Sequence, residues 1–142
     1  MRRPNPLETM NQPHDPETIA VVLVEDDEDV RHGCVQALEL AGFTVQAFGS
    51  VEAARKAVRP GAPLVLLCDV MLPGMHATQW LPEVRALDAD LPLILMTGHG
   101  DIAMAVQAIR DGAYDFIEKP ASSERIVAVV QRAAEKRRLV LK

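Results

Sequence analysis

Four short segments of this chain, three of them apolar, each end on side chains that could take part in chemistry. The polar residues that follow them are Glu25 and Asp26, Asp69, Thr97, and Lys119. A carboxylate at the end of a buried strand is costly unless a cation or hydrogen bonds meet it. If the four segments are neighbouring parallel strands, three acidic side chains, a hydroxyl and an amine meet at one edge of a sheet.

The acidic residues at these ends predict a cation site. In an open α/β sheet, ligands bind beyond the carboxyl ends of the strands, where the strand order reverses. A strand order of 2-1-3-4-5 would bring Glu25, Asp26 and Asp69 together there. Like charges this close raise one another's pKa values. Mg²⁺ would remove the conflict, because it is held by few carboxylates and keeps several waters.

The other two residues predict phosphoryl chemistry at the same edge. The Thr97 hydroxyl and the Lys119 ammonium would approach Asp69 from strands four and five. A metal ion and an ammonium neutralise the oxygens of a phosphoryl group in transit, and a hydroxyl donates one hydrogen bond. Asp69 is the natural nucleophile and would form an acyl phosphate.

These residues require alternating strands and helices to position them. The expected strands are Ile19–Val24, Phe43–Phe48, Leu64–Cys68, Leu93–Met96 and Ala113–Ile117. The expected helices are Glu28–Ala41, Val51–Arg59, Thr78–Leu87, Ile102–Arg110 and Ser122–Arg138. Strands that are apolar on both faces suit a parallel sheet covered by helices. We therefore expect an α/β fold, a flavodoxin-like doubly wound sheet of five parallel strands in the order 2-1-3-4-5 with five helices.

Composition limits the classes of function. The chain has 142 residues, of which 49 % are hydrophobic and 25 % charged, and its net charge is −5. A negative charge disfavours non-specific nucleic-acid binding, and no apolar run approaches membrane-spanning length. The start of the chain lacks the apolar stretch of a signal peptide. Cys34 and Cys68 are not closely spaced, so we expect buried, reduced thiols and a cytoplasmic protein.

Domain boundaries follow from polarity and proline content. Residues 1–18 are polar, contain four prolines, and are expected to form a flexible tail. Residues 19–138 are expected to form one domain. Residues 139–142 add the apolar run Leu139-Val140-Leu141, which we interpret as the start of a linker helix.

The motifs resemble the receiver domain of two-component response regulators over about Ile19 to Arg138. The matching motifs are Val24-Glu25-Asp26-Asp27, Asp69-Val70-Met71-Leu72-Pro73-Gly74-Met75, Met96-Thr97-Gly98 and Glu118-Lys119-Pro120. The resemblance implies that Asp69 receives a phosphoryl group from a sensor histidine kinase. It also implies a cis peptide bond between Lys119 and Pro120.

The same resemblance implies a role for each site residue. Asp26 would bind Mg²⁺ directly, Glu25 largely through water, and Met71 through its backbone carbonyl. Thr97 and Lys119 would hold the phosphoryl oxygens. Thr97 and the aromatic Phe116 on strand five would form the switch.

The second half of the domain resembles the receivers of DctD-type regulators of dicarboxylate transport. Residues 97–109, 111–117 and 132–140 carry this likeness. In that family of sigma-54 activators an ATPase and a DNA-binding domain follow the receiver, and this sequence has neither a phosphate-binding loop nor a helix-turn-helix. We therefore expect a receiver whose output domain is missing, which does not itself contact nucleic acid or membrane. We also expect a homodimer, which pairs either through the end of the last helix or through the face formed by the fourth helix, the fifth strand and the fifth helix.

Two positions depart from the receiver pattern. His76-Ala77 stands where the family usually has Asp-Gly, and Pro82 is tolerated best in a first helical turn. The third helix is therefore expected to start late, with Thr78 as its cap. Ala121 replaces the usual Phe after Lys-Pro, which changes local packing.

Two other functions remain open from the residues alone. A Mg²⁺-dependent phosphohydrolase could also use an aspartyl phosphate, but such enzymes carry a second carboxylate two residues after the nucleophile, where this chain has Met71. A degenerate receiver that only binds partners is the other alternative. The complete set of acidic residues, Thr97 and Lys119 argues against it.

Overall fold

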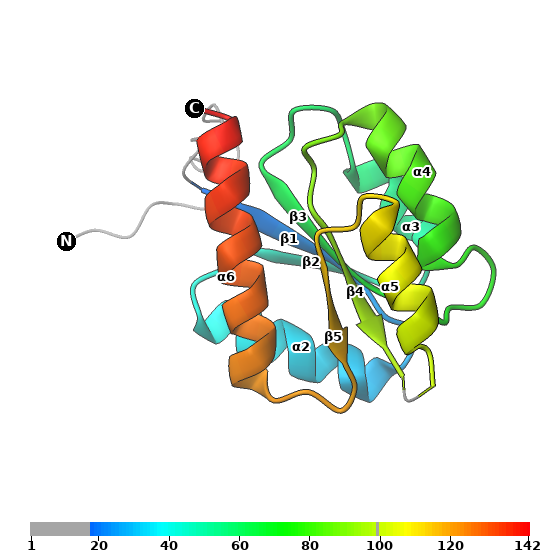
Figure 1. Ribbon diagram of the computed structural model, residues 1–142. Helices are drawn as coiled ribbons and strands as arrows, with labels where there is room; N and C mark the ends of the chain where they lie inside the picture. The colour runs from blue at the N-terminus through cyan, green and yellow to red at the C-terminus, as the bar shows by residue number, and fades with distance from the viewer. Residues whose placement is uncertain (1–17, 99) are drawn as a thin grey trace.

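The computed structural model describes residues 18–98 and 100–142, and these form one five-stranded parallel sheet covered by helices on both faces (Figure 1). The sheet order is β2-β1-β3-β4-β5, as predicted. The strands are β1 (Ala20–Val24), β2 (Val45–Phe48), β3 (Leu64–Asp69), β4 (Leu93–Thr97) and β5 (Asp115–Glu118). The helices are α2 (Glu28–Leu40), α3 (Val51–Ala54), the 3-10 helix η1 (Arg55–Ala57), α4 (Ala77–Leu87), α5 (Ile102–Arg110) and α6 (Ser123–Val140).

The core has two layers, one on each face of the sheet. Helices α2 and α6 cover one face, and α3, α4 and α5 cover the other (Figure 1). Alternate residues of the central strands enter opposite layers: Val22 packs with the α3, α4 and α5 side, and Leu23 with the α2 and α6 side. Trp80 is a buried packing residue, as its apolar context indicates. Cys34 and Cys68 are buried and free, as predicted.

Local capping explains where most helices begin. Asp27 caps α2 by accepting a hydrogen bond from Val30 N, and Ser50 and Ser122 cap α3 and α6 in the same way. The second predicted helix is shorter than expected. Its α-helical part ends at Ala54, and η1 ends at Ala57 with Val58 extended. Pro60 disfavours helical backbone at the residue before it, so the chain leaves the helix early.

The start of α4 corrects the prediction that Thr78 would cap a late helix. The helix begins at Ala77 with His76 as its cap residue. The amide of His76 donates to Gln79 Oε1 at 2.9 Å, which ties the cap residue to the first turn of the helix. Pro82 lies inside the helix, beyond the first turn, so the expected restriction on its position was wrong.

Helix α6 is longer than predicted and reaches Val140. Its buried residues form a stripe along one side, which includes Ile126, Val130, Ala133 and Arg137. Leu139 and Val140 continue the helix on its exposed side. Within the described residues, no helix combines the length and apolarity that a membrane crossing needs.

Candidate functional site

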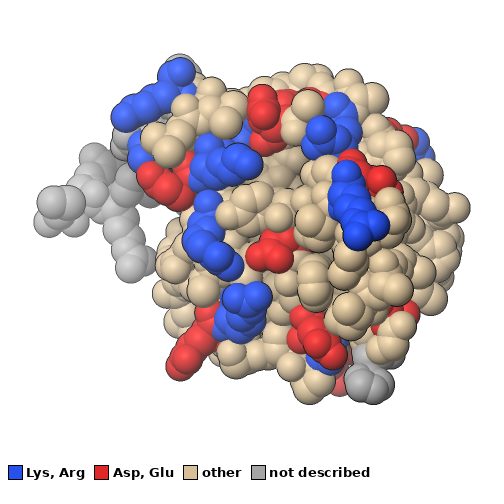
Figure 2. Space-filling view, viewed as in Figure 1, with Lys and Arg blue, Asp and Glu red and all other residues tan. Residues whose placement is uncertain are grey.

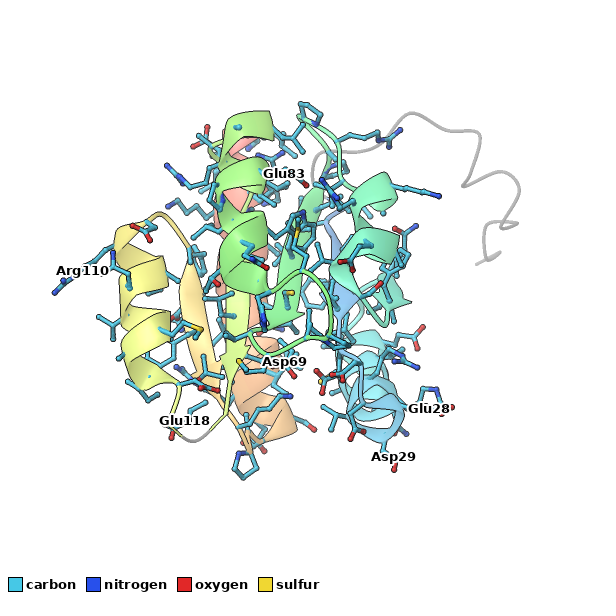
Figure 3. All side chains as sticks on the ribbon, turned by 90° about the vertical axis from the view of Figure 1, so that its right-hand side faces the viewer. Glu28, Asp29, Asp69, Glu83, Arg110 and Glu118 are labelled. Atoms are coloured by element: carbon cyan, nitrogen blue, oxygen red, sulfur yellow. The ribbon has the colours of Figure 1, made fainter. Side chains whose placement is uncertain are left out.

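The three predicted acidic residues meet at the carboxyl edge of the sheet. The β1–β3 register pairs Val24 with Cys68, so Glu25 and Asp69 follow side by side. One carboxylate oxygen from each of Glu25, Asp26 and Asp69 lies within 4.8 Å of the others. Figure 3 shows Asp69 at this end of the sheet. The predicted convergence of the acidic residues is therefore confirmed.

Lys119 joins this cluster from β5. Its Nζ donates to Asp69 Oδ2 at 2.6 Å and to Glu25 Oε1 at 2.9 Å. Its burial opposes the charged form, but the hydrogen bonds to Asp69 and Glu25 outweigh this and raise the pKa of Lys119. The ammonium therefore stays charged beside Asp69. The Lys119–Pro120 peptide bond is cis, as the resemblance implies.

Glu25 is the most deeply buried acid of the site, with 1 % of its surface exposed. Burial raises its pKa to about 7, and the hydrogen bond with Asp69 adds to this while Lys119 opposes it. Its Oε1 receives Lys119, but its Oε2 is buried with no hydrogen-bond partner among the described residues. A buried carboxylate oxygen without a partner is costly. A hard cation would give this oxygen a partner, so the carboxylate oxygens of the cluster fit Mg²⁺ as ligands.

Thr97 ends β4 directly beside this cluster. The amide of Lys119 donates to Thr97 O at 2.7 Å, and the amide of Val70 donates to Met96 O at 2.9 Å. These bonds fix the ends of three strands relative to one another. The Thr97 hydroxyl is fully buried and has no partner in the described part of the chain. This buried hydroxyl lies on the strand that pairs with β3, next to the strand that ends at Asp69.

Met71 and Phe116 are the remaining predicted residues of the site. Met71 N donates to Asp69 Oδ1 at 3.2 Å, which orients the carboxylate at the start of the β3–α4 loop. Phe116 is partly buried on β5 and packs against the core layer of α3, α4 and α5. Glu28 and Asp29 occupy the first turn of α2, apart from Asp69 in Figure 3. His99, two residues after Thr97, lies outside the described residues.

Two contacts at the site were missed by the sequence reasoning. The carboxylate of Glu52 on α3 accepts a hydrogen bond from Met75 N at 2.8 Å, across the β3–α4 loop. Arg31 Nη1 on α2 donates to Glu25 O at 2.8 Å. Both are charged side chains bonded to backbone groups, 23 residues away along the chain for Glu52 and six for Arg31. No sequence pattern marks such contacts, because the backbone partner can belong to any residue.

The charged surface along α6 is mixed. Figure 2 shows basic side chains along α6 with acidic ones near them. Arg132 pairs with Asp115 at 3.7 Å, and Arg138 pairs with Glu135 at 2.6 Å. On this face, acidic side chains partly neutralise the positive charge of α6.

Comparison with known proteins connects this geometry to a family. Residues 21–131 match the response regulator receiver domain family. The C4-dicarboxylate transport transcriptional regulatory protein DctD of Rhizobium meliloti is 50 % identical over 122 residues, which are 86 % of this chain and 26 % of that protein. DctD of Pseudomonas aeruginosa is 43 % identical over 91 % of this chain and 28 % of its own length.

A solved structure is similar along nearly its whole length. The receiver domain of NtrX from Brucella abortus has a TM-score of 0.72 and 34 % identity, and the match covers 81 % of this chain and 98 % of that one. This chain spans only about a quarter of the length of the two DctD proteins. The family match and the shared fold establish that this chain belongs to the response regulator receiver domain family.

Proposed function

We propose that this domain accepts a phosphoryl group on Asp69 from a sensor histidine kinase. The observation that carries the proposal is the set of groups around one carboxylate. Lys119 Nζ lies 2.6 Å from Asp69 Oδ2, and the Thr97 hydroxyl, which has no partner among the residues described, lies on the neighbouring strand. A cation and a buried donor beside one nucleophile suit a transferred phosphoryl group better than they suit a structural ion pair.

The proposed step is an in-line displacement at phosphorus. An Asp69 carboxylate oxygen forms a bond to phosphorus while the bond from phosphorus to the donor histidine nitrogen breaks, and that nitrogen keeps the electron pair. Lys119 and Thr97 stabilise the phosphoryl oxygens, whose negative charge would otherwise be uncompensated in a buried site. Mg²⁺, when bound, supplies positive charge to the same oxygens.

Three acidic residues and one backbone group would hold the metal. We assign Asp26 and Asp69 as direct ligands, Glu25 as a ligand mainly through water, and the Met71 carbonyl as the backbone ligand. Glu25 Oε2 supports this assignment, because this buried oxygen has no hydrogen-bond partner among the described residues. Thr97 and Phe116 would report the phosphorylated state to the surface around β5.

The proposed output follows the DctD relatives. We infer a domain that undergoes its own phosphorylation and dephosphorylation and has no separate substrate. It would act in the cytoplasm and switch the output domain of a sigma-54 activator of the DctD type. Its proposed parts are a tail at residues 1–18, a receiver at 19–138 and a linker that begins at residue 139. Residues 1–17 of that tail lie outside the described residues. The 50 % identity with DctD of Rhizobium meliloti supports this assignment.

The test is incubation with acetyl phosphate and Mg²⁺, followed by intact-mass measurement. We expect one added phosphate that persists for minutes, and no addition to Asp69→Asn, whose circular dichroism should match that of the wild type. Continuous release of inorganic phosphate at enzymatic rates would instead favour the phosphohydrolase. Full phosphorylation of Asp69→Asn would overturn the assignment of the nucleophile.

A further inference from the structure

The β3–α4 loop is tied at both of its ends by carboxylates. Near its start, Met71 N donates to Asp69 Oδ1 at 3.2 Å. Near its end, Met75 N donates to Glu52 Oε1 at 2.8 Å. Glu52 belongs to a different segment, α3, and is not one of the acidic residues of the metal cluster. The loop that begins at the nucleophile is therefore positioned by a second acid from another element.

Gly74 shows how closely the Glu52 carboxylate lies against this loop. Gly74 has a φ of +80°, a conformation that favours glycine. A Cβ atom at this residue would lie 2.7 Å from Glu52 Oε1, closer than real contacts allow. The glycine therefore serves two purposes, because it permits the turn and leaves room for the carboxylate that receives the next amide.

Glu52 is held on a well-anchored element. Val51 and Ala54 on either side of it are fully buried, and Ser50 caps the helix through Ala53 N. Arg55, the first residue of η1 directly after α3, forms an ion pair with Glu83 of α4. The hydrogen bond from Met75 N is the main cause of a lowered pKa at Glu52, so this acceptor remains ionised at neutral pH.

We propose that Glu52 is a positioning residue for the phosphorylation site. Its bond to Met75 N would restrict the five-residue segment that carries the Met71 carbonyl, and would thereby set the affinity for Mg²⁺. Pro73 in the middle of the segment has a fixed φ, so holding both ends leaves few conformations. A loop already held in its bound form loses less entropy when the ion binds. This inference rests on the proposed function and names one residue that tunes its site.

Three variants and a matched control test the inference. Glu52→Ala removes the acceptor, Glu52→Asp draws the carboxylate back by one methylene, and Glu52→Gln keeps an oxygen at the same reach. Glu83→Ala is the control, because it breaks the ion pair between η1 and α4 without changing a residue of the loop. Melting temperature and circular dichroism establish that each variant is folded.

The first readout is independent of metal. Hydrogen exchange of the Met75 amide, followed by NMR in metal-free buffer, should be faster in Glu52→Ala and Glu52→Asp than in wild type. Protection should be largely retained in Glu52→Gln and Glu83→Ala. Unchanged protection in Glu52→Ala would overturn the proposal, because the bond to Glu52 would then not hold the loop.

The second readout is direct Mg²⁺ binding by calorimetry. Loss of one modest hydrogen bond predicts that the dissociation constant rises about two- to tenfold in Glu52→Ala and Glu52→Asp. Glu52→Gln and Glu83→Ala should stay close to wild type. Equal weakening in Glu83→Ala would also overturn the proposal, since the effect would then come from general loosening of α3. If wild type binds Mg²⁺ but acetyl phosphate does not phosphorylate it, the proposed function fails while this test still applies.

Discussion

Arg137 and Asp88 form a buried ion pair at the end of the sheet opposite the phosphorylation site. Arg137 Nη2 donates to Asp88 Oδ2 at 2.8 Å, and only 1 % of the arginine side chain is exposed. Nε and Nη2 of Arg137 also donate to Ala62 O at 3.1 and 2.8 Å. Asp88 in turn accepts from Gly61 N at 2.8 Å. The guanidinium thus joins the last turns of α6 to the segments that precede β3 and β4.

Removing Arg137 should therefore destabilise the domain strongly. Arg137→Ala leaves the Ala62 carbonyl without its side-chain donors, separates Asp88 from its cation and opens a cavity. We expect a loss of about 2 to 4 kcal/mol in the free energy of unfolding, measured by urea denaturation. Arg132→Ala is the matched control, since its exposed pair with Asp115 should contribute less than about 1 kcal/mol. Equal effects of the two substitutions would contradict the structural role given to Arg137.

The same pair should make stability depend on pH in the acid range. The hydrogen bond from Arg137 is the main cause of the lowered pKa of Asp88. The unfolded carboxyl titrates near pH 4, so the folded protein binds fewer protons than the unfolded chain as the pH falls. The contribution of Asp88 is therefore present above about pH 4 and is lost as the pH falls through the folded pKa. Urea denaturation of wild type and Asp88→Asn between pH 3 and 6 measures it, and the difference between them should shrink on acidification. A difference that stays constant over this range would show that the charge of Asp88 is not what matters.

Much of the site could be predicted because it depends on strand ends. Asp69, Thr97 and Lys119 each follow a short apolar strand, and parallel strands place all their carboxyl ends at one edge. The strand order itself came from the flavodoxin-like pattern and is confirmed by the register. Asp26 and Glu25 then had to join them. The positions of these residues at the ends of strands, together with the expected strand order, were sufficient to predict that their side chains meet.

Contacts between a side chain and a distant backbone could not be predicted in the same way. The Glu52 bond to Met75 and the His76 ring within 3.3 Å of Val70 O depend on the path of one loop. Arg137 gave a partial signal, because it fell on the apolar stripe of the last helix. A buried arginine requires acceptors. The sequence could not identify Asp88 as that acceptor, since many acidic residues were available.

Thr97 should show opposite effects on stability and on phosphorylation. Its hydroxyl is buried without a partner in the described part of the chain, so Thr97→Val should stabilise the unphosphorylated domain by about 1 kcal/mol. The same change removes a donor to the phosphoryl group and should slow phosphorylation by acetyl phosphate about tenfold or more. Thermal melting and intact-mass time courses measure the two effects. Thr97→Ser keeps the hydroxyl and is the control. Normal phosphorylation of Thr97→Val would exclude the hydroxyl from the reaction.

Mg²⁺ should stabilise the folded domain through the acidic cluster. An ion that binds only the folded state raises stability by mass action. At a free Mg²⁺ concentration one hundred times the dissociation constant, the free energy of unfolding rises by about 2.7 kcal/mol. Asp26→Ala should abolish the rise in melting temperature, because it removes one of the three convergent carboxylates. Asp29→Ala, in the first turn of α2 but outside the cluster, should keep the rise. A melting temperature of wild type that does not respond to millimolar Mg²⁺ would contradict the metal site.

The end of α6 should support self-association. Leu139 and Val140 expose 55 % and 45 % of their surface on a helix that continues past the buried stripe. Neighbouring exposed apolar residues at a helix end favour pairing with a second helix. We expect a concentration-dependent dimer in sedimentation velocity, shifted towards monomer when residues 139–142 are removed. The double substitution Leu139→Glu and Val140→Glu tests the same surface without shortening the helix, and it should also give monomer. A concentration-independent monomer for the intact chain, phosphorylated or not, would rule out this dimer.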